Sequence, residues 1–479
     1  MNVLYIHQYF CTRAGRSGTR SYEFARFLVQ QGHKVTMLTS DSDLSDVRVP
    51  EGRSQARFSV DGIDVVAVRA PYSQHLGAAG RIQSFLRFMV ASSWAACRLP
   101  RHDVVVATST PLTVGVPGML VSARRRIPLV FEVRDLWPEA PIQMGAIRNP
   151  VLIAVLRAFE RMVYRHSAHI IALSPGMKDG VVAAGVTPER VTMIPKCSDL
   201  DLFKPGVARD ADLDRYDLRG KFVVGYAGSM GEANDVEVLL AAAGHLAGEP
   251  SIAFLLIGGG RQAAELQGRV ARLGLPNVRF AGSMPRQEVA EVLHAADVCV
   301  VLFTAIPVLA TNSPNKLFDA LAAGKPVIVN SDGWTRKLVQ EHGVGRYATP
   351  GSGEALANEI RWLAARRSEL ASMGRRARAL AEKDFDRQKL AQVFSEVLVR
   401  AAGGSPGSIE QDAELVRHVG GSNPQAGDVD STADALLRVV PQVPLHGGGP
   451  AREHDTGNAI DRSRRHVEDI EITTSGDRG

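Results

Sequence analysis

Short apolar runs alternate with stretches of helical periodicity over most of the chain. The runs predict buried strands, and the stretches in which apolar residues recur every three or four positions predict amphipathic helices. The first unit is a strand at 2–7, a helix that ends near Gln30 and a second strand from Gly32. Strands and helices that alternate in this way predict α/β domains with helices packed on parallel sheets.

The same alternation continues to about residue 400. Further strands are expected at 63–68, 103–108, 127–133, 168–174, 191–196, 222–228, 254–257, 277–282, 296–303 and 326–329. Residues 41–60 are mostly polar and are expected to form a loop. At 479 residues, the chain is long enough for two domains. The expected limits are 1–205 for the first domain, 206–384 for the second, 385–401 for a helix that returns to the first domain, and 402–479 for a tail.

The clearest local signals for a helix followed by a strand lie at 311–330. Pro314 suits a helix start because its missing N–H is no loss there, and Gly324 is a suitable C-terminal cap. The apolar residues at helical spacing, which predict a buried stripe, are Leu317, Phe318, Leu321 and Ala322.

Polar residues gather at the start of this helix: Asn312, Ser313, Asn315, Lys316 and Asp319. A helix N-terminus presents free N–H groups and a partial positive charge, which suit a phosphate group. Lys316 in the first turn opposes the helix dipole, and an anionic ligand would supply a reason for it. Asp319, one turn on, could accept hydrogen bonds from ribose hydroxyls. The alternative is a capped surface helix with a solvated lysine.

Other glycine-rich or charged segments also follow predicted strands. In chain order they contain Gly15, Arg16, Ser17, Gly18, Thr19 and Arg20, then Arg134 and Asp135, then Gly228 and Ser229, then Gly258, Gly259 and Arg261. In open parallel sheets, ligands bind at the carboxyl edge of the strands, which is where these segments fall. The alternatives are plain tight turns and, for Arg134, an ion pair with Asp135 or Glu132 that fixes the loop.

Two of these segments resemble a known family. Pro-Asn-Lys-Leu-Phe-Asp at 314–319, followed by Ala-Ala-Gly-Lys-Pro-Val-Ile at 322–328, resembles the donor-binding helix of family 4 glycosyltransferases. Glu-Val-Arg-Asp-Leu-Trp-Pro at 132–138 resembles the matching segment of the bacterial branch that builds O-antigen, capsule and exopolysaccharide, including fucosamine transferases. The resemblance spans roughly residues 2–400.

The resemblance implies a GT-B fold, in which two Rossmann-like, doubly wound domains face each other across a cleft. The first domain would bind the acceptor and the second a nucleotide sugar. The donor contacts would be Gly228, Ser229, Gly258, Gly259, Arg261, Asn312, Ser313, Pro314, Asn315, Lys316, Leu317 and Asp319. An acceptor and phosphate loop would comprise Gly15, Arg16, Ser17, Gly18 and Thr19, together with Arg134. The catalytic residues would be Asp135, which receives the acceptor's proton, and Lys316, which stabilises the leaving diphosphate.

The chain departs from the family pattern at two places. The family has an acidic residue eight positions before the acid that Asp319 matches, and Thr311 occupies that position here. Many members also carry an Arg and a Lys aimed at the diphosphate, where this chain has Met230, Glu232, Asn234 and Asp235. The charge is then expected from Lys316, Arg16, Lys196 or Arg261.

By the resemblance, the enzyme is a retaining transferase that takes a sugar, with an N-acetylated amino sugar as one expectation, from a UDP-linked donor. The acceptor would be polyprenyl-diphosphate-linked or an oligosaccharide. One alternative is a nucleotide-sugar epimerase or hydrolase of the same fold, and another is a non-catalytic partner subunit. A dehydrogenase is disfavoured because no Gly-x-Gly-x-x-Gly follows the first strand.

Charge and composition narrow the choice of partners. Residues 402–479 carry 7 Lys and Arg and 13 Asp and Glu, which leaves 49 basic and 38 acidic residues in the rest. A basic body suits nucleotide sugars, anionic lipid surfaces or nucleic acid, but aromatic residues are only 6% and are not interleaved with basic ones. We therefore expect no nucleic-acid partner. The tail is rich in Gly, Pro, Asp and Arg with little periodicity, which predicts disorder.

The stretch 81–97 has more apolar residues than one narrow helix face requires, and Arg81, Arg87 and Arg98 punctuate it. One interpretation is an amphipathic helix that rests on the inner membrane leaflet, and the other is a core helix of the first domain. No apolar run reaches the roughly 20 residues needed to span a bilayer. We expect a cytoplasmic protein, either free or peripheral on the inner face of the membrane.

The sequence predicts neither a metal site nor a disulfide framework. The four cysteines, Cys11, Cys97, Cys197 and Cys299, are scattered and no pair has metal-ligand spacing. We therefore expect helix dipoles and basic side chains, rather than a metal ion or a cofactor, to balance the charge of the donor.

Overall fold

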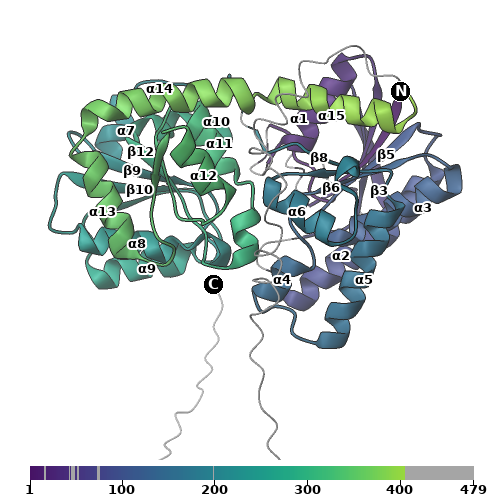
Figure 1. The fold of residues 1–479 in the computed structure, drawn as a ribbon, viewed down its shortest axis with the longest axis horizontal. Coiled ribbons are helices and arrows are strands. Elements are labelled where there is room, and N and C mark those ends of the chain that lie inside the picture. Colours follow the sequence, from purple (N-terminus) through teal and green to yellow (C-terminus); the bar gives the residue numbers. More distant parts are fainter. Residues whose placement is uncertain are drawn as a thin grey trace, which may run out of the picture. The chain divides into compact units, whose positions relative to one another are not determined.

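The computed structural model describes residues 1–13, 15, 18–42, 44, 49–50, 53–72, 76–197 and 199–404, and it contains two separate β-sheets (Figure 1). The first has eight strands in the order β3-β4-β2-β1-β5-β6-β7-β8, and the second has six in the order β11-β10-β9-β12-β13-β14. Strand order that departs from chain order, with helices between the strands, is the wound arrangement predicted from the alternating pattern. The prediction of two Rossmann-like domains is confirmed.

The first sheet is parallel except at one edge. Its strands are β1 (Asn2–Ile6), β2 (Lys34–Ser40), β3 (Gln55–Val60), β4 (Ile63–Val68), β5 (Val104–Thr108), β6 (Leu129–Val133), β7 (His169–Ala172) and β8 (Val191–Met193). β3 pairs antiparallel with β4, so the prediction of a loop over all of 41–60 is wrong. Asp61 and Gly62, with φ of 48° and 79°, form the tight turn between the two strands. β3 reads as polar because it is a half-exposed edge strand.

Helices cover both faces of the first sheet. They are α1 (Arg20–Gln30), α2 (Ala78–Arg98), α3 (Gly115–Arg125), α4 (Glu139–Gln143), α5 (Pro150–His166) and α6 (Pro175–Ala183). Figure 1 shows α2, α3 and α5 together on one side of the sheet, away from α1. Short 3₁₀ helices lie at Leu112–Val114 and Pro188–Arg190.

The second sheet is parallel throughout and has a hydrophobic cluster on each face. Its strands are β9 (Phe222–Ala227), β10 (Ile252–Ile257), β11 (Val278–Gly282), β12 (Val298–Val301), β13 (Val327–Val329) and β14 (Gly345–Tyr347). Its helices are α8 (Val236–His245), α9 (Ala263–Leu273), α10 (Arg286–Val292), α11 (Asn315–Ala322), α12 (Trp334–Glu341), α13 (Gly353–Ala364) and α14 (Arg367–Asp384). Short 3₁₀ helices lie at Glu232–Asn234, Leu293–Ala295 and Pro307–Thr311, and α7 (Asp210–Arg215) lies in the segment that joins the sheets.

The last described helix, α15 (Arg387–Ala401), follows the second sheet in sequence but packs with the first (Figure 1). Asp386 caps its start by accepting hydrogen bonds from the N–H groups of Gln388 and Lys389. Phe394 is fully buried, with its ring 5.9 Å from that of Tyr5 and 5.0 Å from that of Phe24. The core of the first domain is therefore completed by the far end of the described chain.

The predicted domain limits stay predictions, and most of the predicted tail lies outside the described residues. The disorder predicted for 402–479 falls, from residue 405 on, outside the described residues. Among the described residues, no helix has both the length and the apolar character that crossing a bilayer would require.

The packing of α15 leads to a stability prediction. Phe394→Ala should lower the free energy of unfolding by about 3–5 kcal/mol, because it leaves a cavity between Tyr5 and Phe24. The measurement is urea denaturation followed by circular dichroism. Leu273→Ala, at a side chain that is 57% exposed, is the control and should change stability by less than about 0.5 kcal/mol. An equal, small effect of both substitutions would mean that α15 does not belong to this core.

Candidate active site

A cavity of about 840 Å³ lies at the carboxyl ends of the strands of both sheets. The first domain contributes Gly18, Asp135 and Lys196, from loops that follow β1, β6 and β8. The second contributes the turns after β9 and β10 and the start of α11. The volume is within the range of about 300–1,000 Å³ found for small-molecule sites.

Most of the predicted site residues line this cavity. They are Gly18, Asp135, Gly228, Ser229, Gly258, Gly259, Asn312, Ser313, Pro314, Asn315, Lys316 and Asp319. Thr19 and Arg134 line a smaller hollow, which shares Gly18, Lys196, Arg286 and Asn315 with the cavity. Arg16 and Ser17 lie outside the described residues.

Three predicted residues are placed elsewhere. Leu317 has no exposed surface and belongs to the hydrophobic core, so it supports α11 from below. Gly15 packs against Cys11, because a Cβ at Gly15 would lie 2.0 Å from the Cys11 sulfur. Arg261 forms an ion pair with Glu232, and both side chains are more than half exposed.

The start of α11 is built as the sequence predicts. Leu317, Phe318 and Leu321 are fully buried. Gly324, with φ of 65°, closes the helix, since its N–H donates to the Leu321 carbonyl and the next N–H, from Lys325, donates to the Ala320 carbonyl. This anchoring fixes the direction of the helix and aims its free N–H groups at the cavity.

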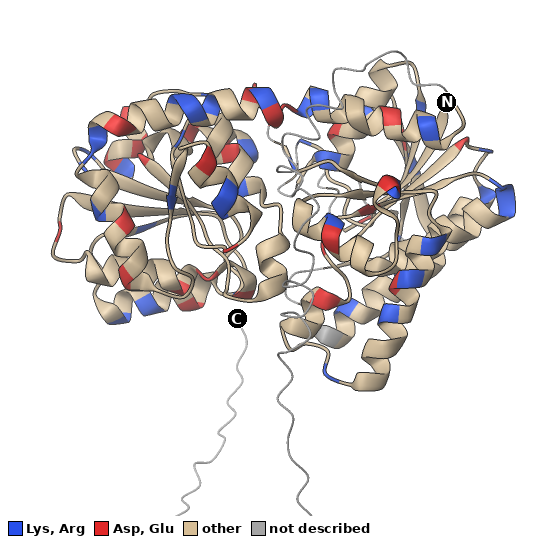
Figure 2. Cartoon of the chain, viewed as in Figure 1, with Lys and Arg blue, Asp and Glu red and all other residues tan. Residues whose placement is uncertain are grey.

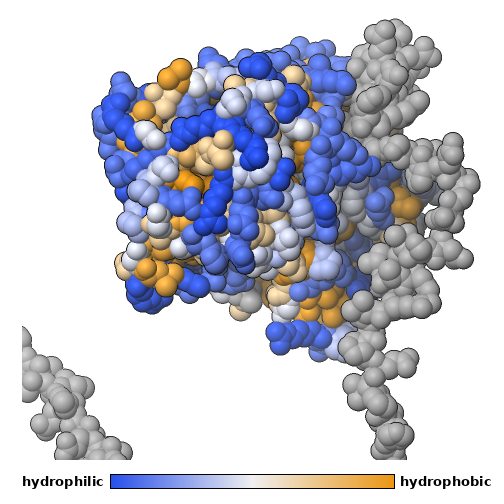
Figure 3. All heavy atoms as spheres, turned by 60° about the vertical axis from the view of Figure 1, so that its left-hand side comes forward, coloured by the Kyte–Doolittle hydropathy of each residue, from blue (hydrophilic) through white to orange (hydrophobic). Residues whose placement is uncertain are grey.

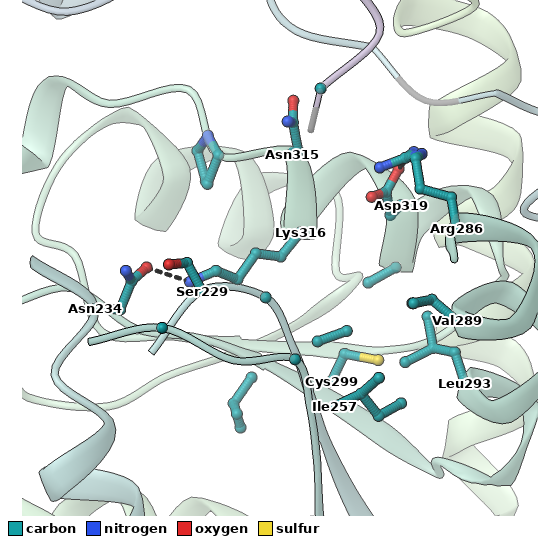
Figure 4. A pocket seen from close by; sticks show the side chains of 18 of the residues that line it. Ser229, Asn234, Ile257, Arg286, Val289, Leu293, Cys299, Asn315, Lys316 and Asp319 are labelled. Carbon is teal, nitrogen blue, oxygen red and sulfur yellow. Dashed lines mark hydrogen bonds and ion pairs between the residues drawn. The ribbon is translucent and has the colours of Figure 1, made fainter. Parts of the chain in front are cut away.

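Lys316 reaches from α11 across to the turn after β9 (Figure 4). Its Nζ donates to the Tyr226 hydroxyl at 3.1 Å and to Asn234 Oδ1. The side chain passes directly over Gly228, since a Cβ there would lie 2.9 Å from Lys316 Cε. Burial, together with the nearby charge of Lys196, lowers the pKa of Lys316 to about 7. Both hydrogen-bond partners are neutral, so Lys316 brings a positive charge that these groups do not balance.

The glycine turns bring backbone close to backbone. A Cβ at Gly258 would lie 2.0 Å from the Gly228 carbonyl oxygen, and one at Gly260 would lie 2.4 Å from that of Met230. The Met230 N–H donates to the Gly259 carbonyl at 2.7 Å. The glycines are therefore needed for the two turns to pack together beneath Lys316.

Lys196 adds a second positive charge from the first domain. Its backbone N–H donates to Ser313 Oγ at 3.1 Å, which joins the loop after β8 to the segment before α11. Burial lowers the pKa of Lys196 to about 8, although the Asp135 carboxylate acts in the opposite direction. Two half-buried ammonium groups at one cavity favour an anionic ligand.

Asp319 forms an ion pair with Arg286, the first residue of α10, at 3.1 Å. Both side chains are mostly buried, and the guanidinium also lies 5.0 Å from the ring centre of Phe203. In Figure 4 this pair lies on one side of the cavity and the Lys316–Asn234 pair on the other. The pair orients the Asp319 carboxylate at the edge of the cavity.

Between these pairs, the cavity has an apolar wall. Figure 4 shows Ile257, Val289, Leu293 and Cys299 grouped below the two polar pairs. They come from β10, α10, the following 3₁₀ turn and β12. A flat heterocyclic ring could pack against this wall while the charged groups hold a polar remainder.

The polar groups of the first domain form a connected set at the ends of β1 and β6. Asp135 Oδ2 accepts a hydrogen bond from Thr110 Oγ1 at 2.7 Å. Arg134 donates to His7 Nε2 at 3.0 Å, so His7 carries its proton on Nδ1 and donates to Ser21 Oγ at 2.7 Å. Burial, and then the Arg134 charge, hold the pKa of His7 well below its usual value.

Glu132, one of the two partners considered for Arg134 in the alternative interpretation, pairs with another arginine. Arg20 pairs with Glu132 at 2.8 Å, deep in the domain, and donates to the Pro195 and Ile194 carbonyls. Burial would raise the pKa of Glu132, but Arg20 and Arg134 together hold it below the usual value. The charge of Arg20, which follows the glycine loop, is therefore balanced by a buried carboxylate.

Thr311, at the position where the family has an acidic residue, joins the two domains. Its carbonyl accepts from Ser174 Oγ, and a Cβ at Gly176 would lie 2.9 Å from its methyl group. Its own hydroxyl donates to the Val308 carbonyl at 2.7 Å. Its side chain is thus engaged with protein groups.

Lys196, Asn234 and Arg286 are site residues whose contacts the sequence did not indicate. Their partners are 117, 82 and 33 positions away in the chain. The only local signal was Arg286 directly after Pro285 at a helix start. In the described part of the chain, no three His, Cys, Asp or Glu side chains come together so that they could hold a metal ion.

Comparison with known proteins identifies the two domains. Residues 17–197 match the model of a glycosyl transferase 4-like domain, and residues 221–366 match that of glycosyl transferases group 1. The putative colanic acid biosynthesis glycosyl transferase WcaI of Escherichia coli (strain K12) is 24% identical over 398 residues, which are 79% of this chain and 94% of that protein.

Solved structures show the same fold. Sucrose-phosphate synthase from Thermosynechococcus elongatus superposes with a TM-score of 0.68 at 19% identity, over 84% of this chain and 100% of that one. HepE of Anabaena, in complex with UDP-glucose, superposes with a TM-score of 0.61 at 21% identity, over 84% and 100%. The GT-B arrangement is confirmed, and the chain belongs to the glycosyltransferases, as the resemblance of its α11 segment to family 4 predicts.

Proposed function

We propose that the protein transfers a sugar from a nucleoside-diphosphate sugar to a growing cell-surface polysaccharide or its lipid-linked precursor. The observation that carries the proposal is the pair of ammonium groups, Lys316 and Lys196, at the start of α11. The relatives support the pathway, since WcaI is named for colanic acid biosynthesis and AmsK of Erwinia amylovora for amylovoran biosynthesis. HepE, crystallised with UDP-glucose, supports a UDP-linked donor.

The donor would lie along the second domain. Its diphosphate meets Lys316, Lys196 and the free N–H groups of α11, which together replace the basic pair that the sequence lacks. The base packs on the apolar wall, and the ribose hydroxyls donate to Asp319, whose carboxylate Arg286 orients. With Thr311 turned to the protein, other groups must hold the hydroxyls of the transferred sugar.

The reaction is a displacement at the anomeric carbon. The bond from that carbon to the β-phosphate oxygen breaks as the bond to the acceptor oxygen forms, and the nucleoside diphosphate leaves. Negative charge grows on the leaving diphosphate, so Lys316 and Lys196 stabilise the transition state more than the bound donor. Asp135, held by Thr110, receives the acceptor's proton. Attack from the face that the diphosphate leaves would retain the anomeric configuration without a protein nucleophile or a metal ion.

An assay of the donor without an acceptor separates the first alternative, an epimerase or hydrolase, from a transferase. An epimerase or hydrolase would alter the donor without an acceptor, whereas a transferase needs both. We therefore expect the purified protein to leave UDP-glucose unchanged over hours when it is alone, as followed by proton NMR. A partner subunit would bind the donor but turn over no acceptor.

The donor class follows from a thermal-shift screen. UDP and UDP-sugars should raise the melting temperature more than GDP and GDP-sugars at equal concentration, because ligands that bind only the folded state stabilise it by mass action. The choice is informative because one relative is named a GDP-mannose-dependent mannosyltransferase. Selective stabilisation by GDP-mannose would exclude a UDP-linked donor. It would not contradict the proposed diphosphate site, because GDP-mannose also carries a diphosphate.

Lys316→Met should lower the transfer rate by about 10²–10³-fold while the protein keeps its fold, because a charge that acts on the leaving group is lost. Steady-state kinetics with the selected donor provide the measurement. Lys204→Met, at an exposed lysine of the segment between the sheets, is the matched control and should leave the rate unchanged. Near-normal turnover of the Lys316→Met protein would exclude the phosphate role.

Donor affinity should fall as the pH rises from 6.5 to 9. The free protein loses the protons of Lys316 near pH 7 and of Lys196 near pH 8, and only the ammonium forms attract the diphosphate. We expect the Kd of UDP-glucose, measured by isothermal titration calorimetry, to rise by about tenfold or more over this range. Lys316→Arg keeps its charge throughout and should show a smaller rise. An unchanged Kd for the unsubstituted protein would contradict the assignment.

A further inference from the structure

Exposed apolar side chains are concentrated on one part of the first domain. Of the twelve large hydrophobic side chains that are exposed in the described part of the chain, ten lie between Ile82 and Met162. They belong to α2, α3 and α5 and to the end of α4, and α3 contacts both α2 and α5. We call this surface, formed by α2, α3, α4 and α5, the α2–α5 face.

Along α2, the exposed residues form a continuous stripe. Ile82, Leu86, Val90 and Trp94 follow at intervals of four, so they lie one above another on the helix. Between 48% and 66% of each side chain is exposed. The opposite face of α2 packs on the sheet through Phe88 and Ala96. The core-helix interpretation thus holds for one face of α2, and the helix has a second, uncovered apolar face.

α5 has few buried residues for a helix that carries so many apolar side chains. Its only buried residues are Val163 and Tyr164 in the last turn, so the turns before them contribute no fully buried side chain. They nevertheless carry Val151, Leu152 and Val155, which are 70%, 45% and 57% exposed. Apolar residues on a soluble helix normally face a core. In Figure 3, hydrophobic side chains gather near the bottom of the described part of the molecule. This is the height at which α4 and α5 lie in Figure 1.

The same helices are strongly basic. Together α2, α3, α4 and α5 contain eight arginines and two acidic residues, Glu160 and Glu139, of which Glu139 pairs with Arg157. Figure 2 shows this excess of basic over acidic positions along them. Arg98 lies over the ring of Trp94, so a cation and an amphipathic ring share one end of the stripe. Apolar residues flanked by arginines and an exposed tryptophan are the combination that binds the headgroup region of an anionic bilayer.

Aromatic rings join the start of the stripe to the loop after β1. Phe85, beside Leu86, lies 6.3 Å from the ring centre of Tyr72, and Tyr72 lies 4.9 Å from that of Tyr9. Tyr9 is in the loop after β1, whose later part includes Gly18 at the cavity. The start of the stripe therefore contacts the loop that also supplies Gly18 to the cavity.

We propose that the α2–α5 face docks the protein on an anionic lipid bilayer. Its apolar residues enter the interface while its arginines contact lipid phosphates. A second copy of the chain is a poorer occupant, because the two faces would bring two sets of arginines together. Docking does not depend on the reaction; only the delivery of a lipid-linked acceptor to Asp135 rests on the proposed function.

The test is sedimentation of the full chain with vesicles of phosphatidylcholine that contain 30% phosphatidylglycerol, or none, at two salt concentrations. The protein should bind the anionic vesicles and be released by salt. Val151→Ser/Leu152→Ser/Val155→Ser should lower the partition coefficient by about tenfold or more, as should Arg87→Gln/Arg161→Gln/Arg165→Gln. Because the substitutions could disturb the fold of α5, Ile82→Ser/Val90→Ser on α2 is a second variant. It should also bind the anionic vesicles more weakly.

The matched control is Val207→Ser/Leu273→Ser, and it should bind as the unsubstituted protein does. It removes the two large exposed apolar side chains that lie elsewhere in the described residues. Equal binding to both vesicle types, or unchanged binding of the α2 and α5 variants, would overturn the proposal. So would a dimer, detected by light scattering, that the α5 variant makes monomeric. Calorimetry with UDP-glucose in the absence of vesicles separates the two proposals, because docking variants should keep donor affinity.

Discussion

A positive charge that its own hydrogen-bond partners do not neutralise lies at the centre of this structure. Lys316 is half-buried, bonded to the neutral Tyr226 hydroxyl and Asn234 amide, and placed at the helix end where the dipole already favours anions. Its pKa is lowered because both burial and Lys196 disfavour the ammonium. The glycines of the neighbouring turns and the buried stripe of α11 are the structural means by which the chain holds a cation in this position.

Lys196 connects this charge to the rest of the molecule. It belongs to the first domain, yet its backbone is bonded to Ser313 in the second, and Ser174 is bonded to Thr311 nearby. The cavity is therefore lined by both domains, and α15, which follows the second sheet in sequence, completes the core of the first. A ligand that bridges Lys196 and Lys316 would stabilise the contact between the domains, which gives donor binding a route to organise the acceptor side.

The sequence predicted those features that depend on neighbours in the chain. All strands except β3 and β14, the buried stripe of α11 and the Gly324 cap follow from periodicity and local backbone chemistry. The Asp61–Gly62 turn was also a local signal, and missing it turned β3 into a loop. The pairs Arg20–Glu132 and Arg286–Asp319 could not be predicted, since their members meet only after the sheet is wound. Periodicity likewise identified the apolar residues of α2 but could not tell which of its faces the fold leaves uncovered.

The most direct test of the central claim is a crystal structure of the protein with UDP-glucose bound. The account predicts diphosphate oxygens within about 3.5 Å of Nζ of both Lys316 and Lys196, beside the first turn of α11. A diphosphate bound elsewhere, with the start of α11 empty, would contradict it.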